Sequence, residues 1–323
     1  MIIGYFLLCL LLKQSIPDLL ASAHALCEYE SNSSYKWLDD RVFLQSKAGY
    51  DGLLMSKVDS IDSRKSPVPT LLNKQVQNRV VVQFVISPDS KWLLSYGPER
   101  VDILSFDGTK TYRHSSTPKT RFFCTNALWL PDSKSWVALA ALKNNGIGLV
   151  VSGIKPNSKK TFSLADTDGM SFSLTGIQPG ILLGCISKKE ILFFGGRGLF
   201  PVRSEFRSGY PLIRLNFENG NESVDWIKPS FYEAGSVVES ISYSRAKNRL
   251  AWLVCSPVRE YARELPNLYR YRCITSDLKG GNIHILGETQ INVSGKIHNF
   301  EWMPSQNRIS FAYNHKIWTL PAD

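Results

Sequence analysis

The chain has 323 residues, of which 43% are hydrophobic and 20% are charged, and its formal net charge is +10. This composition excludes disorder over most of the chain, and the length allows one large domain or two ordinary ones. A sequence pI near 9.3 gives a basic surface that attracts anionic partners but does not identify one.

Residues 1–25 differ from the rest of the chain. The run MIIGYFLLCLLL is apolar but too short to span a bilayer comfortably, and the segments Ala21-Ser22-Ala23 and Ala23-His24-Ala25 have the small-x-small pattern of signal cleavage. We therefore predict a signal peptide over 1–25 and an extracytoplasmic domain, periplasmic or secreted, over 26–323. Because no Lys or Arg precedes the apolar run, an uncleaved N-terminal anchor stays open, and it would be the only link to a membrane.

From residue 34 onward, a polar turn between two apolar runs recurs along the chain. The clearest copies are FVISPDSKWLL and ALWLPDSKSWVA. In chain order the turns lie at Asp39-Asp40, Pro88, Pro131, Lys188, Arg245 and Pro304. Repeats spaced by roughly 40 to 60 residues are typical of propellers, solenoids or arrays.

The segments after each turn favour a propeller. Two further strand-like runs complete the second unit (VDILSFD and KTYRHSS), the third (GIGLVVSGI and KKTFSLA) and the fifth (LYRYRCITSDL and NIHILGE). These runs are rich in β-branched and aromatic residues, and no helix is evident. The sequence therefore predicts an all-β fold, a six-bladed β-propeller with four-stranded blades.

The last unit holds only three predicted strands, KIHNFEWM, RISFAYN and KIWTLPAD. An incomplete blade would leave an open sheet edge. We predict that the segment LCEYES, residues 26–31, supplies the missing outer strand and closes the ring.

The phrases ISPDSKWLLSY, WLPDSKSWVAL and WMPSQNRISFAY resemble the WSPDGxxIAF signature of the WD40-like (PD40) repeats in TolB-like propellers. The resemblance covers residues 27–323, although Ser90 and Ser133 replace the usual glycine and the units at Lys188 and Arg245 lack proline. It implies a TolB-like six-bladed propeller that acts mainly as a binding platform. The same repeat also caps hydrolases, but the chain has no Gly-x-Ser-x-Gly, so the resemblance transfers no hydrolase activity.

The chain shows no clear catalytic or metal-binding pattern. Its histidines are scattered, and its six cysteines form no CxxC array, so we predict no metal and no cofactor. Removal of residues 1–25 would leave five cysteines, an odd number, so at least one thiol is unpaired or pairs between chains. An enzyme with a site at the central channel, such as a lyase, lactonase or glycan hydrolase, remains the alternative to a non-catalytic protein.

Two loops between the second and third strands of a unit are longer than their counterparts. They are GGRGLFPVRSEFRSGY (195–210) and SPVREYARELPN (256–267), in neighbouring units. Long loops on a rigid scaffold concentrate binding residues, and arginine with nearby aromatics suits carboxylates, phosphates and protein hot spots. The candidate binding residues are Arg197, Arg203, Arg207, Arg259, Arg263, Tyr269 and Arg270.

These features predict an extracytoplasmic binding or scaffold module without catalytic activity. Its partner would be a protein or an anionic polymer. Nucleic acid is the weaker prediction, because the pI permits it but no nucleic-acid motif is present.

Overall fold

The computed structural model describes residues 17–28, 34–46, 53–58, 70–73, 83–96, 100–117, 120–142, 147–156, 159–163, 181–187, 190–194, 210–216, 222–227, 236–258, 268–292 and 296–323. No helix among these residues is long and apolar enough to cross a membrane.

The described strands form six antiparallel four-stranded sheets, numbered here in chain order. Sheet 1 contains β2 (Ser34–Trp37), β3 (Val42–Ser46), β4 (Leu53–Lys57) and β5 (Thr70–Asn73). Sheet 2 contains β6 (Gln83–Ile86), β7 (Trp92–Tyr96), β8 (Arg100–Ser105) and β9 (Thr111–Ser115). Sheet 3 contains β10 (Thr120–Trp129), β11 (Ser135–Leu142), β12 (Ile147–Gly153) and β13 (Lys160–Ser163).

The second half of the chain repeats this order. Sheet 4 contains β14 (Ile181–Cys185), β15 (Glu190–Phe194), β16 (Tyr210–Asn216) and β17 (Glu222–Ile227). Sheet 5 contains β18 (Val237–Ser244), β19 (Arg249–Pro257), β20 (Leu268–Ser276) and β21 (His284–Asn292). Sheet 6 contains β22 (His298–Trp302), β23 (Arg308–Tyr313) and β24 (Lys316–Pro321), and its fourth strand is β1 (His24–Glu28).

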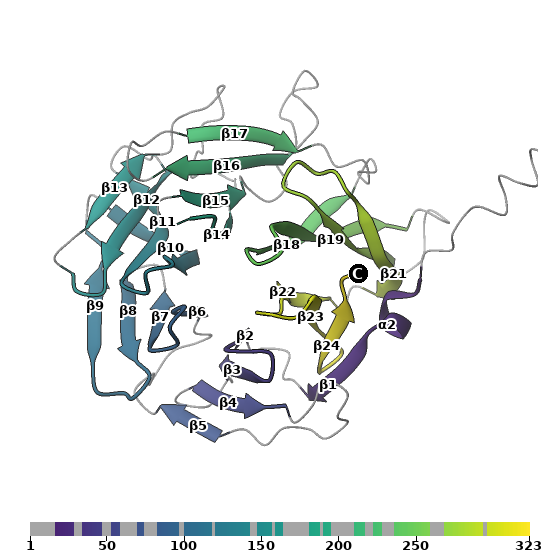
Figure 1. The fold of residues 1–323 in the computed structure, drawn as a ribbon, viewed down its shortest axis with the longest axis horizontal. Coiled ribbons are helices and arrows are strands. Elements are labelled where there is room, and N and C mark those ends of the chain that lie inside the picture. The colour runs from purple at the N-terminus through teal and green to yellow at the C-terminus, as the bar shows by residue number, and fades with distance from the viewer. Residues whose placement is uncertain are drawn as a thin grey trace, which may run out of the picture.

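The sheets stand around a common axis, with the first strand of each repeat nearest the centre (Figure 1). This radial arrangement of four-stranded sheets is that of a β-propeller, so the prediction of an all-β propeller fold is confirmed. The core lies between neighbouring sheets: Leu44 of sheet 1 clusters with Phe84 of sheet 2, and Ile274 of sheet 5 clusters with Leu192 of sheet 4. Burial on both faces explains why most strands read as apolar runs.

The recurring turn connects the first and second strands of its sheet. Ser90 and Ser133 have φ values of 57° and 55°, in the left-handed region where the related signature has glycine. Asp89 Oδ1 accepts the backbone N–H of Lys91, and Asp132 Oδ1 accepts those of Lys134 and Ser135. The aspartates therefore stabilise the turns, because their carboxylates accept hydrogen bonds from the backbone of their own turn.

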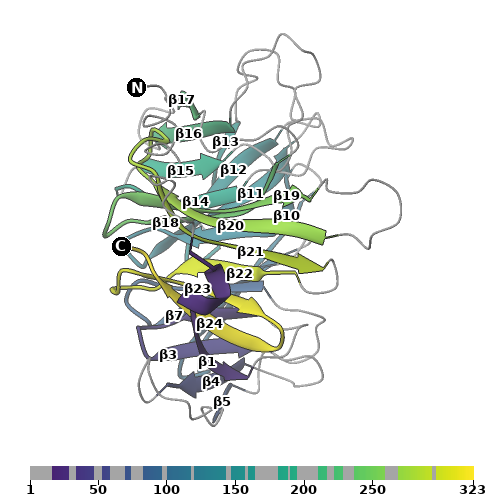
Figure 2. The same cartoon turned by 90° about the vertical axis from the view of Figure 1, so that its right-hand side faces the viewer.

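Residues 17–28 form a continuous segment, called here the N-terminal strap, that lies across sheets 5 and 6 (Figure 2). Glu288 of β21 donates its backbone N–H to the Pro17 carbonyl at 3.0 Å. The single-turn helix α2 (Leu19–Ser22) comes next, capped by Asp18, and β1 then pairs antiparallel with β24.

The strap is packed tightly onto sheet 5. Leu19 is 1% exposed and belongs to the apolar cluster shared by sheets 5 and 6. A Cβ atom added at Gly287 would lie 2.7 Å from the Leu19 Cα, so the strap occupies the space that a side chain at 287 would need. Residues 17–25, predicted from the sequence to belong to the leader, are thus in contact with the sheets. The strand expected at 26–31 occupies 24–28, and residues 29–31 lie outside the described residues.

We predict that Leu19→Ala lowers the free energy of unfolding by about 2–4 kcal/mol, because it leaves a cavity at a site that is closed on all sides. The matched control is Leu20→Ala, where the side chain is only partly buried, and its loss is expected to be less than half as large. Chemical denaturation of the two variants measures both values. Equal small losses would show that the strap does not contribute to the folded core.

Candidate functional site

The two long connections predicted as a binding rim leave adjacent sheets. Fifteen residues separate β15 from β16 in sheet 4, and ten separate β19 from β20 in sheet 5, whereas three separate β7 from β8 and four separate β11 from β12. Both connections join a second strand to a third. The sheets repeat one strand order around the axis (Figure 1). Because of this repetition, equivalent connections start and end at the same face of the ring.

Five of the seven candidate residues lie in these connections, outside the described residues: Arg197, Arg203, Arg207, Arg259 and Arg263. The structure describes Tyr269 and Arg270, which are consecutive residues at the start of β20. Their side chains therefore point to opposite faces of sheet 5. Tyr269 packs against the apolar cluster between sheets 5 and 6, so it belongs to the core between these sheets.

Arg270 lies on the other face of sheet 5. It shares this face with Ile274, which packs in the cluster with Leu192 of sheet 4, so Arg270 faces the side from which the longer connection emerges. Its side chain is 32% exposed, and its Nε lies 3.4 Å from Glu288 Oε1. The other oxygen of Glu288 accepts from Arg272 Nε at 2.5 Å. One carboxylate thus contacts two guanidinium groups.

Glu288 was not among the residues predicted from the sequence, although it lies on the strand next to Arg270. A β-bulge between Cys273 and Ile274 shifts the hairpin register, so that Arg272 pairs with Glu288. Counting outward from the turn would instead place Arg272 opposite Gly287. The ion pair therefore depends on an irregularity that no local pattern in the chain marks.

The innermost strands were the expected position of a channel site. Lys36 of β2 and Glu301 of β22 form an ion pair at 2.5 Å between sheets 1 and 6. Burial raises the pKa of Glu301, and the Lys36 charge and hydrogen bond oppose that shift. Beside this pair, the Trp37 indole donates to Ser310 Oγ at 2.7 Å and the Tyr35 hydroxyl donates to the Asn299 carbonyl at 3.0 Å. We call these contacts the sheet 6–sheet 1 seam. They join the two sheets, so the Lys36–Glu301 pair has a structural role.

Histidines and cysteines do not converge in the described part of the chain, where no group of three or more His, Cys, Asp or Glu side chains could hold a metal ion. Cys27, Cys185, Cys255 and Cys273 are buried and free. Burial raises the pKa of Cys27 and Cys185 to about 12 and that of Cys255 to about 11. These thiols are therefore protonated near neutral pH and are poor nucleophiles.

Comparison with known proteins finds similarity in solved structures. A structure described as putative TolB from Agrobacterium tumefaciens has 13% sequence identity and a TM-score of 0.49, over 79% of this chain and 80% of that chain. TolB from Acinetobacter baumannii has 14% identity and a TM-score of 0.46, over 96% of this chain and 66% of that chain. No protein-family model and no curated protein matches the chain.

We predict that Lys36→Met costs about 1–2 kcal/mol of unfolding free energy at neutral pH, since it leaves the Glu301 carboxylate buried without its partner. Because Lys36 is 40% exposed, the loss is smaller than for a fully buried pair. The pKa of Glu301 is raised in the folded state, and loss of the Lys36 charge raises it further. The destabilisation should therefore grow as the pH rises through that pKa and shrink in acid, where Glu301 is protonated.

The control for this substitution is Lys316→Met, because Lys316 makes an exposed pair with Glu28 at 3.9 Å. We expect it to change stability by at most about 0.5 kcal/mol. Urea unfolding of both variants between pH 4 and pH 8 (a range around the usual Glu pKa of about 4.3) measures the two curves. A pH-independent loss in Lys36→Met would contradict the electrostatic explanation.

We also predict that Cys27, Cys185, Cys255 and Cys273 do not react with a thiol reagent in the native protein and react fully after denaturation. Their burial blocks access, and their raised pKa values deplete the thiolate. Mass mapping of labelled peptides assigns each reaction to its cysteine. Rapid native labelling of any of the four, or a disulfide between two of them, is the contrary result.

Proposed function

We propose that the chain is a non-catalytic, TolB-like six-bladed β-propeller that serves outside the cytoplasm as a binding scaffold for a protein partner or an anionic ligand. Each of the sheets 1–6 is one blade, and β1 closes the ring by completing the sixth. The recurring PDSK-type turns and the pairing of β1 with β24 support this architecture.

The observation that carries the binding role is the placement of the two long connections. They leave one face of adjacent blades, and Arg270, a described residue beside them, stands on the blade-5 face that turns toward blade 4. With Arg197, Arg203, Arg207, Arg259 and Arg263 in the connections, we propose an arginine-rich rim. Guanidinium groups form bidentate hydrogen bonds with carboxylates and phosphates, so the rim suits an acidic partner surface.

The contacts of the N-terminal strap change the position at which we propose that the leader is cleaved. Cleavage after Ala23 or Ala25 would remove Leu19, which is buried, and separate the Pro17 contact from Glu288. We therefore propose that residues 17–25 remain with the propeller. A leader peptidase would then cut before Pro17, or residues 1–16 would stay as an anchor; the mass of the native protein distinguishes these outcomes from a start at residue 24 or 26.

The rim is tested with the variant Arg203→Glu/Arg207→Glu/Arg259→Glu in cross-linking pull-downs from an extracytoplasmic extract. We expect its recovery of the partner to fall at least about tenfold relative to wild type, because hot-spot arginines dominate such interfaces. Arg270→Met should weaken recovery as well, by a smaller factor.

The control reverses three exposed cations away from the rim, Arg41→Glu/Arg245→Glu/Lys279→Glu, and changes the net charge by the same amount. It should recover the partner as wild type does. Thermal unfolding confirms that all variants are folded. Equal recovery by the rim variant and wild type would contradict the rim assignment.

A further inference from the structure

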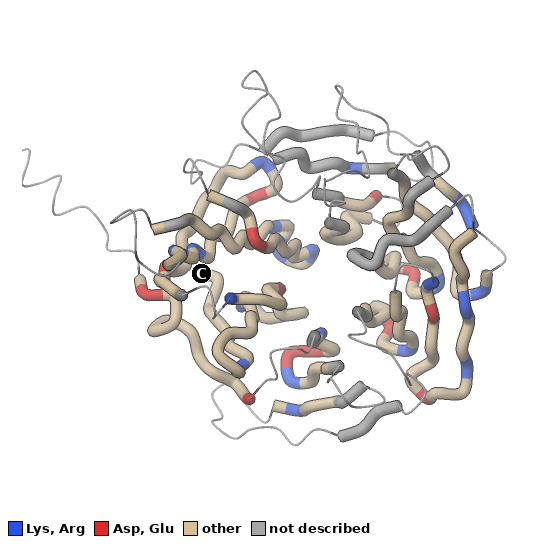
Figure 3. Tube along the Cα trace, turned by 180° about the vertical axis from the view of Figure 1, so that it is seen from behind, with Lys and Arg blue, Asp and Glu red and all other residues tan. Residues whose placement is uncertain are grey.

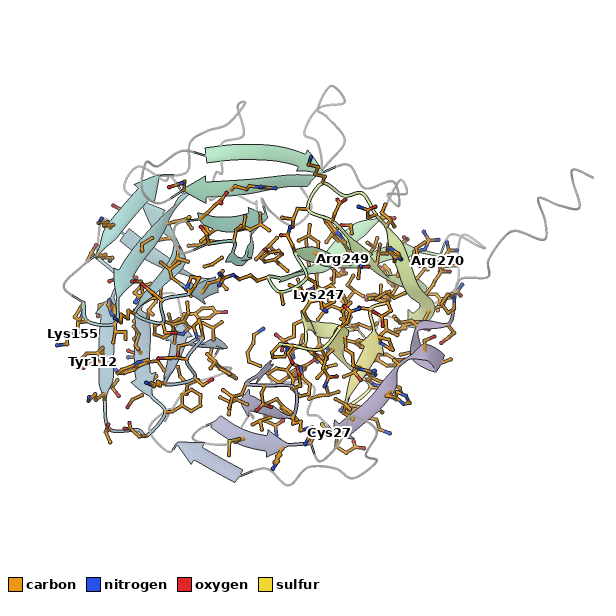
Figure 4. The ribbon with its side chains drawn as sticks, in the orientation of Figure 1. Cys27, Tyr112, Lys155, Lys247, Arg249 and Arg270 are labelled. Atoms are coloured by element: carbon orange, nitrogen blue, oxygen red, sulfur yellow. The ribbon has the colours of Figure 1, made fainter. Side chains whose placement is uncertain are left out.

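The N-terminal strap has two halves that pack into different parts of the ring. In residues 17–23, called here the strap head, Leu19 and Ala23 belong to the apolar cluster between sheets 5 and 6. In β1, Leu26 and Cys27 belong to the cluster that sheet 6 shares with sheet 1. Figure 4 labels Cys27 on β1, at the end of the strand away from α2. The strap head and β1 therefore contribute to separate interfaces between sheets.

The strap head is seated on β21 by shape and by a backbone hydrogen bond. Gly287 of β21 has no side chain, and the three atoms nearest to a Cβ added there all belong to Leu19, at 2.7, 3.1 and 3.2 Å. At the next residue of β21, the Glu288 N–H donates to the Pro17 carbonyl at 3.0 Å. At this point the strap head thus covers the outer edge of β21.

Apolar contact, rather than charge, holds the strap head in place. The strap contains no Lys or Arg, and in Figure 3 it runs along the outer edge of the ring as a mostly tan tube. Asp18 accepts the Ala21 N–H within its own helix at 2.8 Å. Helix α2 has four residues, and an isolated helix of fewer than about 12 residues is not stable in water.

The burial of the strap head is confined to two side chains. Leu19 and Ala23 are buried, and the other residues of 17–23 are partly or fully exposed. Segments with few buried apolar contacts open locally at a lower free energy than the whole fold. We therefore expect the strap head to open while the sheets stay folded.

A pattern that resembles a cleavage site lies where the strap head meets β1. Ala21-Ser22-Ala23 is a small-x-small motif that ends at the bond between Ala23 and His24. Proteases cut chain that is exposed and locally unfolded. In the docked state α2 occupies the residues before this bond, and the β1–β24 ladder begins directly after it. The docked strap head therefore shields the bond.

Hydrolysis of the Ala23–His24 bond would separate the two halves of the strap. Water adds across the bond, so that Ala23 gains a carboxylate and His24 gains an amine. Strand β1 (His24–Glu28) stays complete and keeps its ladder with β24. The strap head would lose its covalent link, and its departure would free the Glu288 N–H and the space beside Gly287.

We propose that the strap head is a proteolytic latch. While it is docked on sheet 5 it shields the Ala23–His24 bond. When it opens, an endopeptidase selective for small residues cuts this bond and leaves a folded propeller whose outer strand β21 has an uncovered edge. The inference rests on the proposed retention of residues 17–25. The mass of the native protein tests that retention, whereas cleavage of the full chain tests the latch, so the two proposals can fail separately.

The experiment measures cleavage of the full chain by elastase, which accepts small residues, and assigns each cut by mass. In the variant Gly287→Ala, the new methyl group collides with the Leu19 backbone and displaces the strap head, while the sequence around the cleaved bond is unchanged. We expect cleavage after Ala23 to be at least about tenfold faster than in wild type, because the rate follows the population of the open state. The control is Gln290→Ala, an exposed position on the opposite face of β21, which should be cut at the wild-type rate.

Hydrogen exchange gives a second readout, because the partner of the Glu288 amide is the Pro17 carbonyl. This amide should exchange at least about tenfold faster in Gly287→Ala, while the amides of β19 keep their wild-type rates. Leu19→Asp removes the same contact from the side of the strap and should give the same two changes. Protected β19 amides show that each variant is folded.

Four results would overturn the proposal. Wild-type cleavage after Ala23 as fast as in Gly287→Ala would mean that the docked strap head shields nothing. Unchanged cleavage in both Gly287→Ala and Leu19→Asp would mean that opening does not control the cut. Global unfolding of both variants, or unfolding of the chain once it is cut after Ala23, would mean that the propeller cannot remain folded without the strap head.

Discussion

The contact on which the architecture depends is the joint between the last sheet and the beginning of the chain. A sheet in such a ring has two apolar faces, and each must be covered by a neighbour. Sheets 1 to 6 succeed one another along the chain, but sheet 6 and sheet 1 are far apart in sequence, so their seam is made by long-range contacts. The Trp37–Ser310 hydrogen bond and the Lys36–Glu301 ion pair supply them, and the β1–β24 ladder ties the beginning of the chain into sheet 6.

The recurring turn also joins neighbouring sheets. Asp89 donates its backbone N–H to the hydroxyl of Ser133, 44 residues later and in the equivalent turn of the next sheet. Asp40 likewise accepts the backbone N–H of Ser305, in the turn of sheet 6. A glycine at position 133 would adopt the left-handed conformation with less strain, but it could not make the contact with Asp89. Serine at this position thus adds a bond between sheets to the geometry of the turn.

In a ring held in this way, the residues that hold the sheets together are different from those proposed to bind a partner. The Lys36–Glu301 ion pair joins two sheets, the His114 imidazole bonds the Ile154 carbonyl, and the four described thiols are buried. The sheets differ from one another in the length of the second-to-third connection. The proposed arginine rim uses this variable and would place cations on a rigid support, which lowers the entropy lost on binding.

Local patterns in the chain were sufficient for the first two strands of each sheet and the turn between them, because an apolar run, a polar turn and a second apolar run specify a hairpin without reference to the rest of the molecule. The structure decided the features that depend on distant residues. The bulge at Cys273 and Ile274 places Glu288 between Arg270 and Arg272, and Gly287 leaves the space in which Leu19 is buried. The cleavage-like Ala-x-Ala pattern could not predict the burial of Leu19, because that burial depends on contacts with strands near the far end of the chain.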